Sequence, residues 1–260
     1  MLSTLTSYRM ISSDMTRSLD RVAGEPVVKR ETSYYLANIT EVKSIDDFMK
    51  NDRIYNYAMK AFGLGDMAYA KGFIRKLLTD GVIDTKALAN QLTDPRYKAF
   101  AKTFNFASLG SNTTLLPAAQ KAVVDQYNQQ QLESEAGSQN TGVQLALYFA
   151  RKASGLSNGY QVLADKALVK VVQTVLGWPD TVLSGNIDKL ASTIESKIDL
   201  KSLSDPKELD KFLTRFAAMY DVQNRTANST VPNLLIGSPI QYGFSSDVMA
   251  ALQSFKPGGI

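Results

Sequence analysis

Residues 51–64 of the chain read NDRIYNYAMKAFGL. Asp52 can cap the start of a helix, because its carboxylate accepts hydrogen bonds from the first free backbone amides. The apolar residues from Ile54 to Phe62 recur at spacings of three and four, which places them on one helix face. Gly63 stands where helices commonly end, since glycine readily adopts the left-handed conformation that closes a last turn. This stretch predicts a short amphipathic helix.

The same signals for helix starts and ends recur around it. Ser44 followed by Asp47 resembles a capping box, with aspartate in place of the usual glutamate. Asp66 can start the next helix and Gly81 can end it. Asp94-Pro95 gives a cap followed by proline at the first helical position, where its missing N–H costs nothing. We therefore expect a series of short helices.

A second stretch repeats this pattern about one hundred residues later. Residues 164–178 read ADKALVKVVQTVLGW and align with 51–64 after one insertion: acid, base, apolar face, glycine, large apolar residue. Downstream, Asp94-Pro95 corresponds to Asp205-Pro206, and Phe100 and Phe104 correspond to Phe212 and Phe216. The shared order predicts an internal duplication. The alternative is that aspartate caps and glycine ends recur in any helical protein.

The predicted fold is all-α and multihelical, with two diverged copies of one helical unit packed together. Short amphipathic helices are marginal alone and need a partner that buries their apolar faces. Strand candidates are limited to Val27-Val28 and 231–240, and two prolines argue against a central strand in the latter. The expected organisation is an N-terminal helix and linker, a first repeat, connecting helices, a second repeat and a C-terminal tail: 1–33, 34–110, 111–157, 158–223 and 224–260.

The composition excludes several kinds of chemistry. The 260 residues contain no cysteine and no histidine. Disulfides, thiolate nucleophiles, Cys/His zinc sites and histidine general bases are therefore absent. The net charge of +4 is spread thinly, and the longest basic cluster is Lys29-Arg30. A nucleic-acid binder normally carries a basic stripe, so we expect no nucleic-acid partner.

No catalytic, cofactor-binding or metal-binding residues are predicted, and no cofactor is expected. Gly63-Leu64-Gly65 is not a phosphate loop, because no Gly-Lys-Ser/Thr follows it. Carboxylate and tyrosine chemistry stay open as an alternative. That alternative needs at least two aspartates to converge in a cleft with perturbed acidity, from a set comprising Asp46, Asp47, Asp52, Asp66 and Asp84.

The candidate partner-binding residues are Tyr55, Tyr57, Leu234, Leu235 and Ile236. Aromatic residues at helical spacing usually form a core, and the alternative is a groove for a small molecule or peptide. The three aliphatic residues form an apolar run in a tail rich in glycine, serine and proline. This run either docks on the body of the protein or contacts a partner.

No continuous apolar segment lies near the N-terminus, so we expect no cleavable signal peptide. No stretch approaches the ~20 apolar residues of a membrane span. We therefore expect no membrane span.

The segments YYLANI (34–39), VKSIDDF (42–48) and 52–64 carry a family resemblance. The chain resembles an uncharacterised helical family, found chiefly in alphaproteobacteria, whose genes often lie in flagellar clusters. The resemblance covers most of residues 30–220. The second copy departs from the pattern, since Leu168 and Lys170 stand where the first has Tyr55 and Tyr57.

The resemblance implies a duplicated multihelical fold and assigns no catalytic residues. From it we expect a non-enzymatic structural or assembly protein associated with the bacterial flagellum. Its partners would be proteins, with flagellar components as the first candidates. The alternative is a helical module that binds a small molecule or peptide. A cytoplasmic and a flagellum-associated location both stay open at this point.

Overall fold

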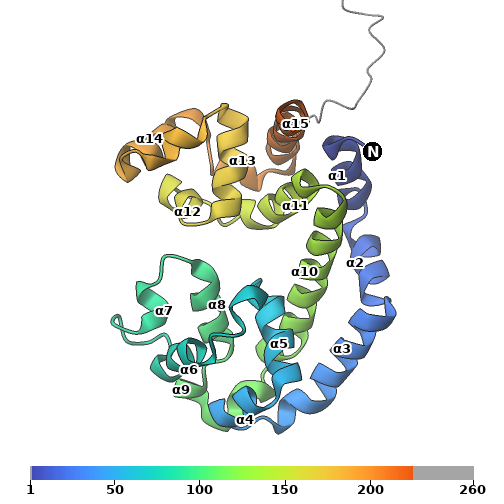
Figure 1. Ribbon diagram of the computed structural model, residues 1–260, viewed down its shortest axis with the longest axis vertical. Helices are drawn as coiled ribbons and strands as arrows, with labels where there is room; N and C mark the ends of the chain where they lie inside the picture. The colour runs from blue at the N-terminus through green and yellow to red at the C-terminus, as the bar shows by residue number, and fades with distance from the viewer. Residues whose placement is uncertain (1, 225–260) are drawn as a thin grey trace, which may run out of the picture. The chain divides into compact units, whose positions relative to one another are not determined.

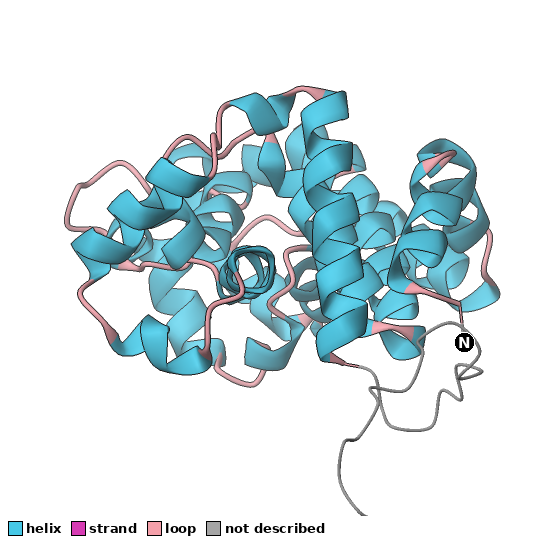
Figure 2. Cartoon of the chain, turned by 90° about the horizontal axis from the view of Figure 1, so that it is seen from above, coloured by secondary structure: helices cyan, strands magenta, loops and turns pink. Residues whose placement is uncertain are grey.

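The structure is a computed structural model that describes residues 2–224, except the side chains of residues 180 and 184. Every regular element in this range is a helix, so the all-α prediction is confirmed for the described residues (Figure 2). Val27 and Val28, named above as a strand candidate, lie inside a helix. The other candidate, 231–240, lies outside the described residues.

The first three helices are α1 (Thr4–Ser12), α2 (Met15–Ala23) and α3 (Pro26–Asn38). Asp14 starts α2 by accepting a hydrogen bond from the Arg17 amide at 3.0 Å. Pro26 occupies the first turn of α3, where proline is tolerated because the first amides have no intrahelical partner.

Six short α-helices follow between residues 45 and 109. They are α4 (Ile45–Lys50), α5 (Asp52–Ala61), α6 (Lys71–Asp80), α7 (Leu88–Gln91), α8 (Pro95–Thr103) and α9 (Phe106–Leu109). The remaining α-helices are α10 (Lys121–Gln139), α11 (Thr141–Ala153), α12 (Gly159–Leu163), α13 (Lys166–Leu176), α14 (Ile187–Lys197) and α15 (Pro206–Gln223). Short 3-10 helices fill several connections, namely Ile39–Glu41, Gly65–Met67, Gly110–Leu115, Pro117–Ala119, Asp180–Ser184 and Ser202–Ser204.

Most predicted helix boundaries are confirmed. The Ser44 hydroxyl accepts from the Asp47 amide at 3.1 Å and donates to its carboxylate at 2.8 Å. Asp94 caps α8 with Pro95 in the first turn. Gly63 and Gly81 both have positive φ directly after a helix. These helix starts and ends can be predicted from the sequence because capping side chains and glycines of positive φ act locally.

Two predicted starts are wrong. Asn51, not Asp52, caps α5, and its side chain accepts from the Ile54 amide. Both residues can cap a helix, so the sequence alone left the start uncertain by one position. Asp66 lies in a 3-10 turn, and α6 begins five residues later at Lys71.

Two hydrophobic cores form within the described residues. The first lies among α3 to α9 and is rich in aromatic rings, including Phe48, Phe100 and Phe104. The second lies among α11 to α15 and is mainly aliphatic. The long helix α10 packs against α5 and against α11, so it links the two cores (Figure 1).

The N-terminal helices also contact both cores. Helix α1 packs against α11 and α15, and its Tyr8 belongs to the second core. Helices α2 and α3 pack against α10, and Val22 and Val28 belong to the first core. The Thr4 amide donates to the Asp221 carboxylate at 3.0 Å, which ties α1 to α15. Helices α1 to α3 thus pack against the helices that form the two cores.

Helices α5 and α13, which lie in the two aligned stretches, end in the same local geometry. After α5, the Gly63 amide donates to the Lys60 carbonyl at 2.9 Å and the Leu64 amide to the Met59 carbonyl at 2.8 Å. After α13, Gly177 and Trp178 make the equivalent bonds at 3.2 and 3.0 Å. Both ends are Schellman motifs with a left-handed glycine. The duplication itself stays a prediction.

Candidate functional site

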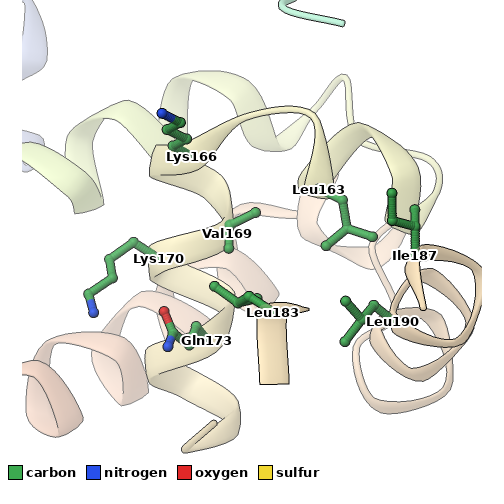
Figure 3. Close-up of a pocket in the computed structure, with 8 residues that line it drawn as sticks. All are labelled: Leu163, Lys166, Val169, Lys170, Gln173, Leu183, Ile187 and Leu190. Carbon is green, nitrogen blue, oxygen red and sulfur yellow. The ribbon is translucent and has the colours of Figure 1, made fainter. Parts of the chain in front are cut away.

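An aliphatic groove opens on the surface of the second half of the chain (Figure 3). Helix α12 packs against both α13 and α14, and the hollow beside it has a volume of about 460 Å³. We call it the α13–α14 groove. Its lining consists of five aliphatic residues and three polar residues of α13: Leu163, Val169, Leu183, Ile187, Leu190, Lys166, Lys170 and Gln173.

Helix α13 has an apolar residue outside its buried stripe, and this residue faces the groove. Leu168, Val171, Val172 and Val175 are buried in the second core. Val169 lies off that stripe and is only partly buried. In a helix, positions 166, 169, 170 and 173 share one face. One face of α13 therefore builds the core, while the adjacent face lines the groove.

Helix α14 forms the opposite wall in the same way. Leu190 is buried, whereas Ile187 at the first turn is 63% exposed. A large aliphatic side chain so exposed beside an apolar hollow loses the free energy that burial would give. Figure 3 shows Leu163, Val169, Leu183, Ile187 and Leu190 converging on the hollow.

Positive charge borders the groove on one side. Lys166 and Lys170 are exposed on α13, and Figure 3 shows their amino groups directed away from the aliphatic cluster. On α14, the Asp188 carboxylate accepts a hydrogen bond from the Tyr160 hydroxyl at 2.9 Å. The groove thus combines an apolar floor with a basic edge.

A second, larger hollow of about 700 Å³ is lined by residues from both halves of the chain. We call it the polar cleft. The Arg96 guanidinium donates to the Asp94 carboxylate at 2.7 and 3.0 Å. Burial opposes ionisation of Asp94, but the hydrogen bonds from Arg96 outweigh it and lower the pKa of that carboxyl. The hydrogen bond to Asp94 likewise raises the pKa of Arg96.

Tyr148 on α11 points its hydroxyl at the carboxylate of Asp165, the cap of α13. Burial raises the pKa of Tyr148 well above its usual value, and the hydrogen bond to Asp165 raises it further. Tyr148 is therefore a hydrogen-bond donor to Asp165 at neutral pH. One turn on, burial and the charge of Arg151 lower the pKa of Lys152.

A buried ion pair stands at the edge of the polar cleft. The side chain of Glu133 is 3% exposed and accepts two hydrogen bonds from Arg151, at 2.7 and 2.9 Å. Gln129 donates a third at 3.1 Å. The carboxylates of Asp94, Glu133 and Asp165 therefore each accept at least one side-chain hydrogen bond.

The structure places Tyr55 inside the first core. Its ring is fully buried and meets Phe48 edge-on, with ring centroids 5.9 Å apart. Burial raises the pKa of Tyr55 to about 12, and its hydroxyl has no hydrogen-bond partner within the described residues. The ring does not reach the surface.

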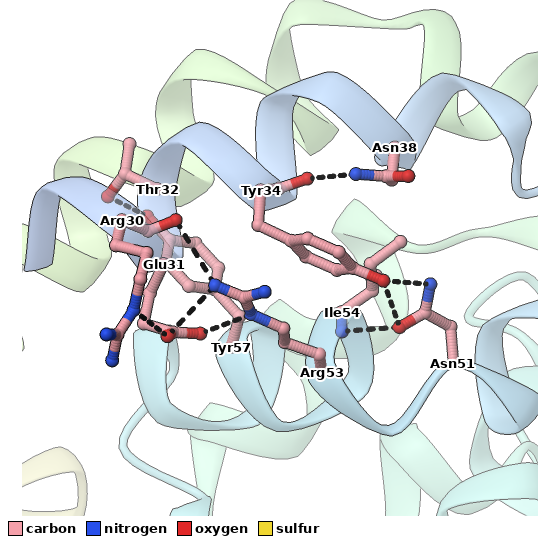
Figure 4. A network of polar contacts seen from close by, with 9 residues as sticks. All are labelled: Arg30, Glu31, Thr32, Tyr34, Asn38, Asn51, Arg53, Ile54 and Tyr57. Carbon is pink, nitrogen blue, oxygen red and sulfur yellow. Dashed lines mark hydrogen bonds and ion pairs between the residues drawn. The ribbon is translucent and has the colours of Figure 1, made fainter. Parts of the chain in front are cut away.

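Tyr57 is also buried, but it borders a hollow of about 360 Å³. Its ring stacks between Tyr35 and Tyr127, at centroid distances of 4.4 and 3.9 Å. Its hydroxyl lies 2.9 Å from the Thr32 hydroxyl (Figure 4). Burial raises the pKa of Tyr57 far above its usual value.

An ion pair next to Tyr57 closes this side of α3 and α5 (Figure 4). Arg53 donates to both carboxylate oxygens of Glu31, at 2.8 and 3.1 Å. These hydrogen bonds lower the pKa of Glu31. The Arg53 guanidinium also lies 3.9 Å from the centre of the Tyr34 ring. Arg53 thus joins α5 to two residues of α3.

Of the five candidate aspartates, Asp47 and Asp52 border the same hollow, and the other three do not border it. Leu234, Leu235 and Ile236 lie outside the described residues. Of the five aspartates, Asp46 pairs with Arg75, Asp52 pairs with Lys71, Asp84 accepts from the Lys86 amide at 2.8 Å, and Asp66 borders the polar cleft. Asp47 and Asp52 border one open hollow, but the Asp47 carboxylate is bound by Ser44, which lowers its pKa.

The groove residues were missed by sequence reasoning. They come from α12, α13, α14 and the connecting 3-10 turn, so no local pattern joins them. One signal was present: Val169 is an apolar residue outside the core stripe of its helix. None of the helices in residues 2–224 has the length and apolar character that crossing a membrane requires.

Comparison with known proteins gives a family without an assigned activity. A family model described as "Protein of unknown function (DUF1217)" matches residues 61–209. The crystal structure of protein AGR_C_984 from Agrobacterium tumefaciens is similar, with 49% sequence identity and a TM-score of 0.80. The match covers 86% of this chain and 98% of that one. No curated protein matches the chain. The chain therefore belongs to the DUF1217 family of proteins of unknown function.

Proposed function

We propose that this protein is a non-enzymatic structural or assembly protein associated with the bacterial flagellum, and that it acts through protein–protein contacts. The flagellar part rests on the resemblance to a family encoded in flagellar gene clusters. The contact part rests on one observation, the open aliphatic α13–α14 groove with its exposed Ile187.

The exposed aliphatic side chains of the groove would gain free energy if a partner buried them. Burying an aliphatic side chain of this size stabilises by about 1.5–3 kcal/mol. A contiguous apolar hollow at the surface of a folded chain is a common mark of a contact site. The polar cleft supports the same view, since the carboxylates of Asp94, Glu133 and Asp165 are each held by a hydrogen bond from a neighbouring side chain.

A duplication would explain how the contact surface arose. We propose that the two helical units share an origin and have since taken different tasks. The first carries the aromatic core, and the second carries the groove. The matching ends of α5 and α13 support this. Distant relatives whose two halves are more alike would strengthen the proposal, and relatives with a wholly unrelated second half would contradict it.

Deleting the gene in the native bacterium tests the function. We expect reduced swimming and fewer or shorter filaments, restored by the wild-type gene. Complementation with Ile187→Asp should fail, because a carboxylate in the groove opposes apolar contact. Ile83→Asp is the matched control, since Ile83 is 77% exposed in the first half of the chain and borders none of the hollows described here. Normal swimming with normal filaments in the deletion strain would contradict the proposal.

The place of action needs a separate experiment. An exported component should be found in shed filaments, whereas a cytoplasmic adaptor or chaperone should capture flagellar export substrates in a pull-down. Fractionation and pull-down on the same culture distinguish these two forms of the proposal.

A second candidate function is a helical module for a small molecule or peptide. The hollow beside Tyr57, with Arg53 and Glu31 at its edge, favours it. A ligand there should shift the NMR signals of the Tyr57 and Tyr127 rings, and a search that finds no such shift would remove this candidate.

A further inference from the structure

We propose that the α13–α14 groove binds the apolar face of an amphipathic α-helix of a partner protein, and that this helix carries acidic residues beside its apolar face. The inference rests on the proposed function, because it names the kind of partner that the protein contacts would involve.

The shape of the groove fits a helix. Lys166, Val169, Lys170 and Gln173 form one stripe of α13. At 1.5 Å per residue, this stripe is about 10 Å long, or two helical turns. Ile187 and Leu190 lie one turn apart on the opposite wall. A helix laid in a groove is held by apolar residues at matching spacings of three and four.

The charge of the edge predicts acidic neighbours. Lys166 and Lys170 are one turn apart on the same side. Asp188 on the other wall is hydrogen-bonded by Tyr160. Glutamate or aspartate next to the partner's apolar stripe would lie beside the exposed Lys166 at the start of α13. Such edge charges set the orientation and the association rate more than the affinity.

Other occupants fit less well. A second copy of the chain, bound groove to groove about a two-fold axis that runs across the groove, would place its lysines against the same lysines. A fatty-acid chain is normally enclosed over most of its surface, whereas this hollow is open along one side. An amphipathic helix needs only one apolar face covered.

Model peptides provide the test. Hydrocarbon-stapled helices of about 16 residues, long enough to be stable with the staple, would carry leucines at helical spacing. One version has glutamates beside the leucines, and its twin has lysines at the same positions. With the full-length protein, fluorescence anisotropy should show the glutamate peptide binding at least about five-fold more tightly than its twin.

Charge reversal makes the test specific. Lys166→Glu should weaken the binding of the glutamate peptide several-fold and strengthen the binding of the lysine peptide. The variant should fold, because a glutamate at the first residue of α13 favours the helix N-terminus. Lys121→Glu, the same change at the first residue of α10, should alter the binding of neither peptide. Ile187→Asp should weaken the binding of both peptides.

Equal binding of both peptides to wild type and Lys166→Glu would overturn the inference. So would peptide-induced NMR shifts outside the groove, a dimer that Ile187→Asp dissociates, or displacement of the peptide by laurate at lower concentration. A different experiment tests the proposed function. A deletion strain that swims normally removes the flagellar function even if the peptides bind, and a non-motile strain retains it even if they do not.

Discussion

Gly63 shows how a single backbone conformation can end a helix and turn the chain. Its φ is +68°, a region that side chains other than glycine enter at a cost. The amides of Gly63 and Leu64 satisfy two carbonyl groups of α5 that would otherwise lack partners. The same solution recurs at Gly177.

Replacing Gly63 with alanine should destabilise the protein by about 1 kcal/mol, because alanine is strained in this conformation. Gly72→Ala is the matched control. A Cβ at position 72 meets no atom within 4 Å, and the residue lies inside α6. There alanine should stabilise by about 0.5 kcal/mol. Urea unfolding of both variants measures the difference, and equal effects would show that φ at Gly63 is unimportant.

The ion pair of Glu133 and Arg151 is the other residue-scale feature with a large expected effect. Arg151→Ala leaves a buried carboxylate with only Gln129 as a donor. We expect the free energy of unfolding to fall by about 3 kcal/mol, since an uncompensated buried charge is costly. Arg9→Ala removes an exposed pair with Asp210 and should cost less than about 0.5 kcal/mol. Thermal unfolding that shows similar losses for the two variants would contradict this ranking.

At the scale of elements, α12 and α14 approach each other unusually closely at Gly159. A Cβ at this position would lie 2.5 Å from the Ala191 carbonyl oxygen and 2.7 Å from its Cα. These atoms belong to backbone, so α14 would have to move. The position of α14, which forms one wall of the α13–α14 groove, therefore depends on the absence of a Cβ at Gly159.

Gly159→Ala should destabilise by about 2 kcal/mol through overpacking and should also distort the groove. Gly155→Ala, four residues earlier, brings the new methyl group no closer than 3.5 Å to the Lys152 carbonyl and should be nearly neutral. Unfolding curves and the binding of the glutamate peptide check the two effects together. Unchanged stability and binding in the Gly159 variant would show that α14 is free to shift.

Helix boundaries were predictable where one residue carries the signal. Asp94-Pro95, Gly81 and Gly177 mark real ends, because capping and left-handed glycine are local chemistry. Asp66 was wrongly predicted to start an α-helix, because aspartate also occurs in 3-10 turns such as the one formed by Gly65–Met67. The groove was not predictable. Its walls meet only after α12 has packed against both α13 and α14, and the close approach at Gly159 has no distinctive sequence signal.

At the scale of the whole molecule, buried tyrosines couple folding to alkaline pH. Burial raises the pKa of Tyr35, Tyr55, Tyr57 and Tyr148, for Tyr55 to about 12. In the unfolded chain these phenols lose their protons near pH 10. Their stabilising contribution is therefore complete below pH 10 and is lost as pH rises through the folded-state values.

We expect stability to fall steeply from about pH 10 to about pH 12, with the buried phenols ionising only as the chain unfolds. Absorbance at 295 nm and far-UV circular dichroism, recorded on the same sample, should show one coincident transition for that fraction of tyrosines. Complete ionisation near pH 10 with the helices intact would contradict the burial of these rings.

The contact of α1 with α15 has a consequence for synthesis. The Thr4 amide donates to Asp221, so Thr4 waits for a residue that is made more than two hundred positions later. At roughly 5–20 residues per second, that wait on the ribosome is on the order of ten to forty seconds. During it, the apolar side of α1 has no α15 to cover it, and the second core cannot close. A newly made chain is thus most open to a chaperone, or to a wrong neighbour, until α15 has been translated.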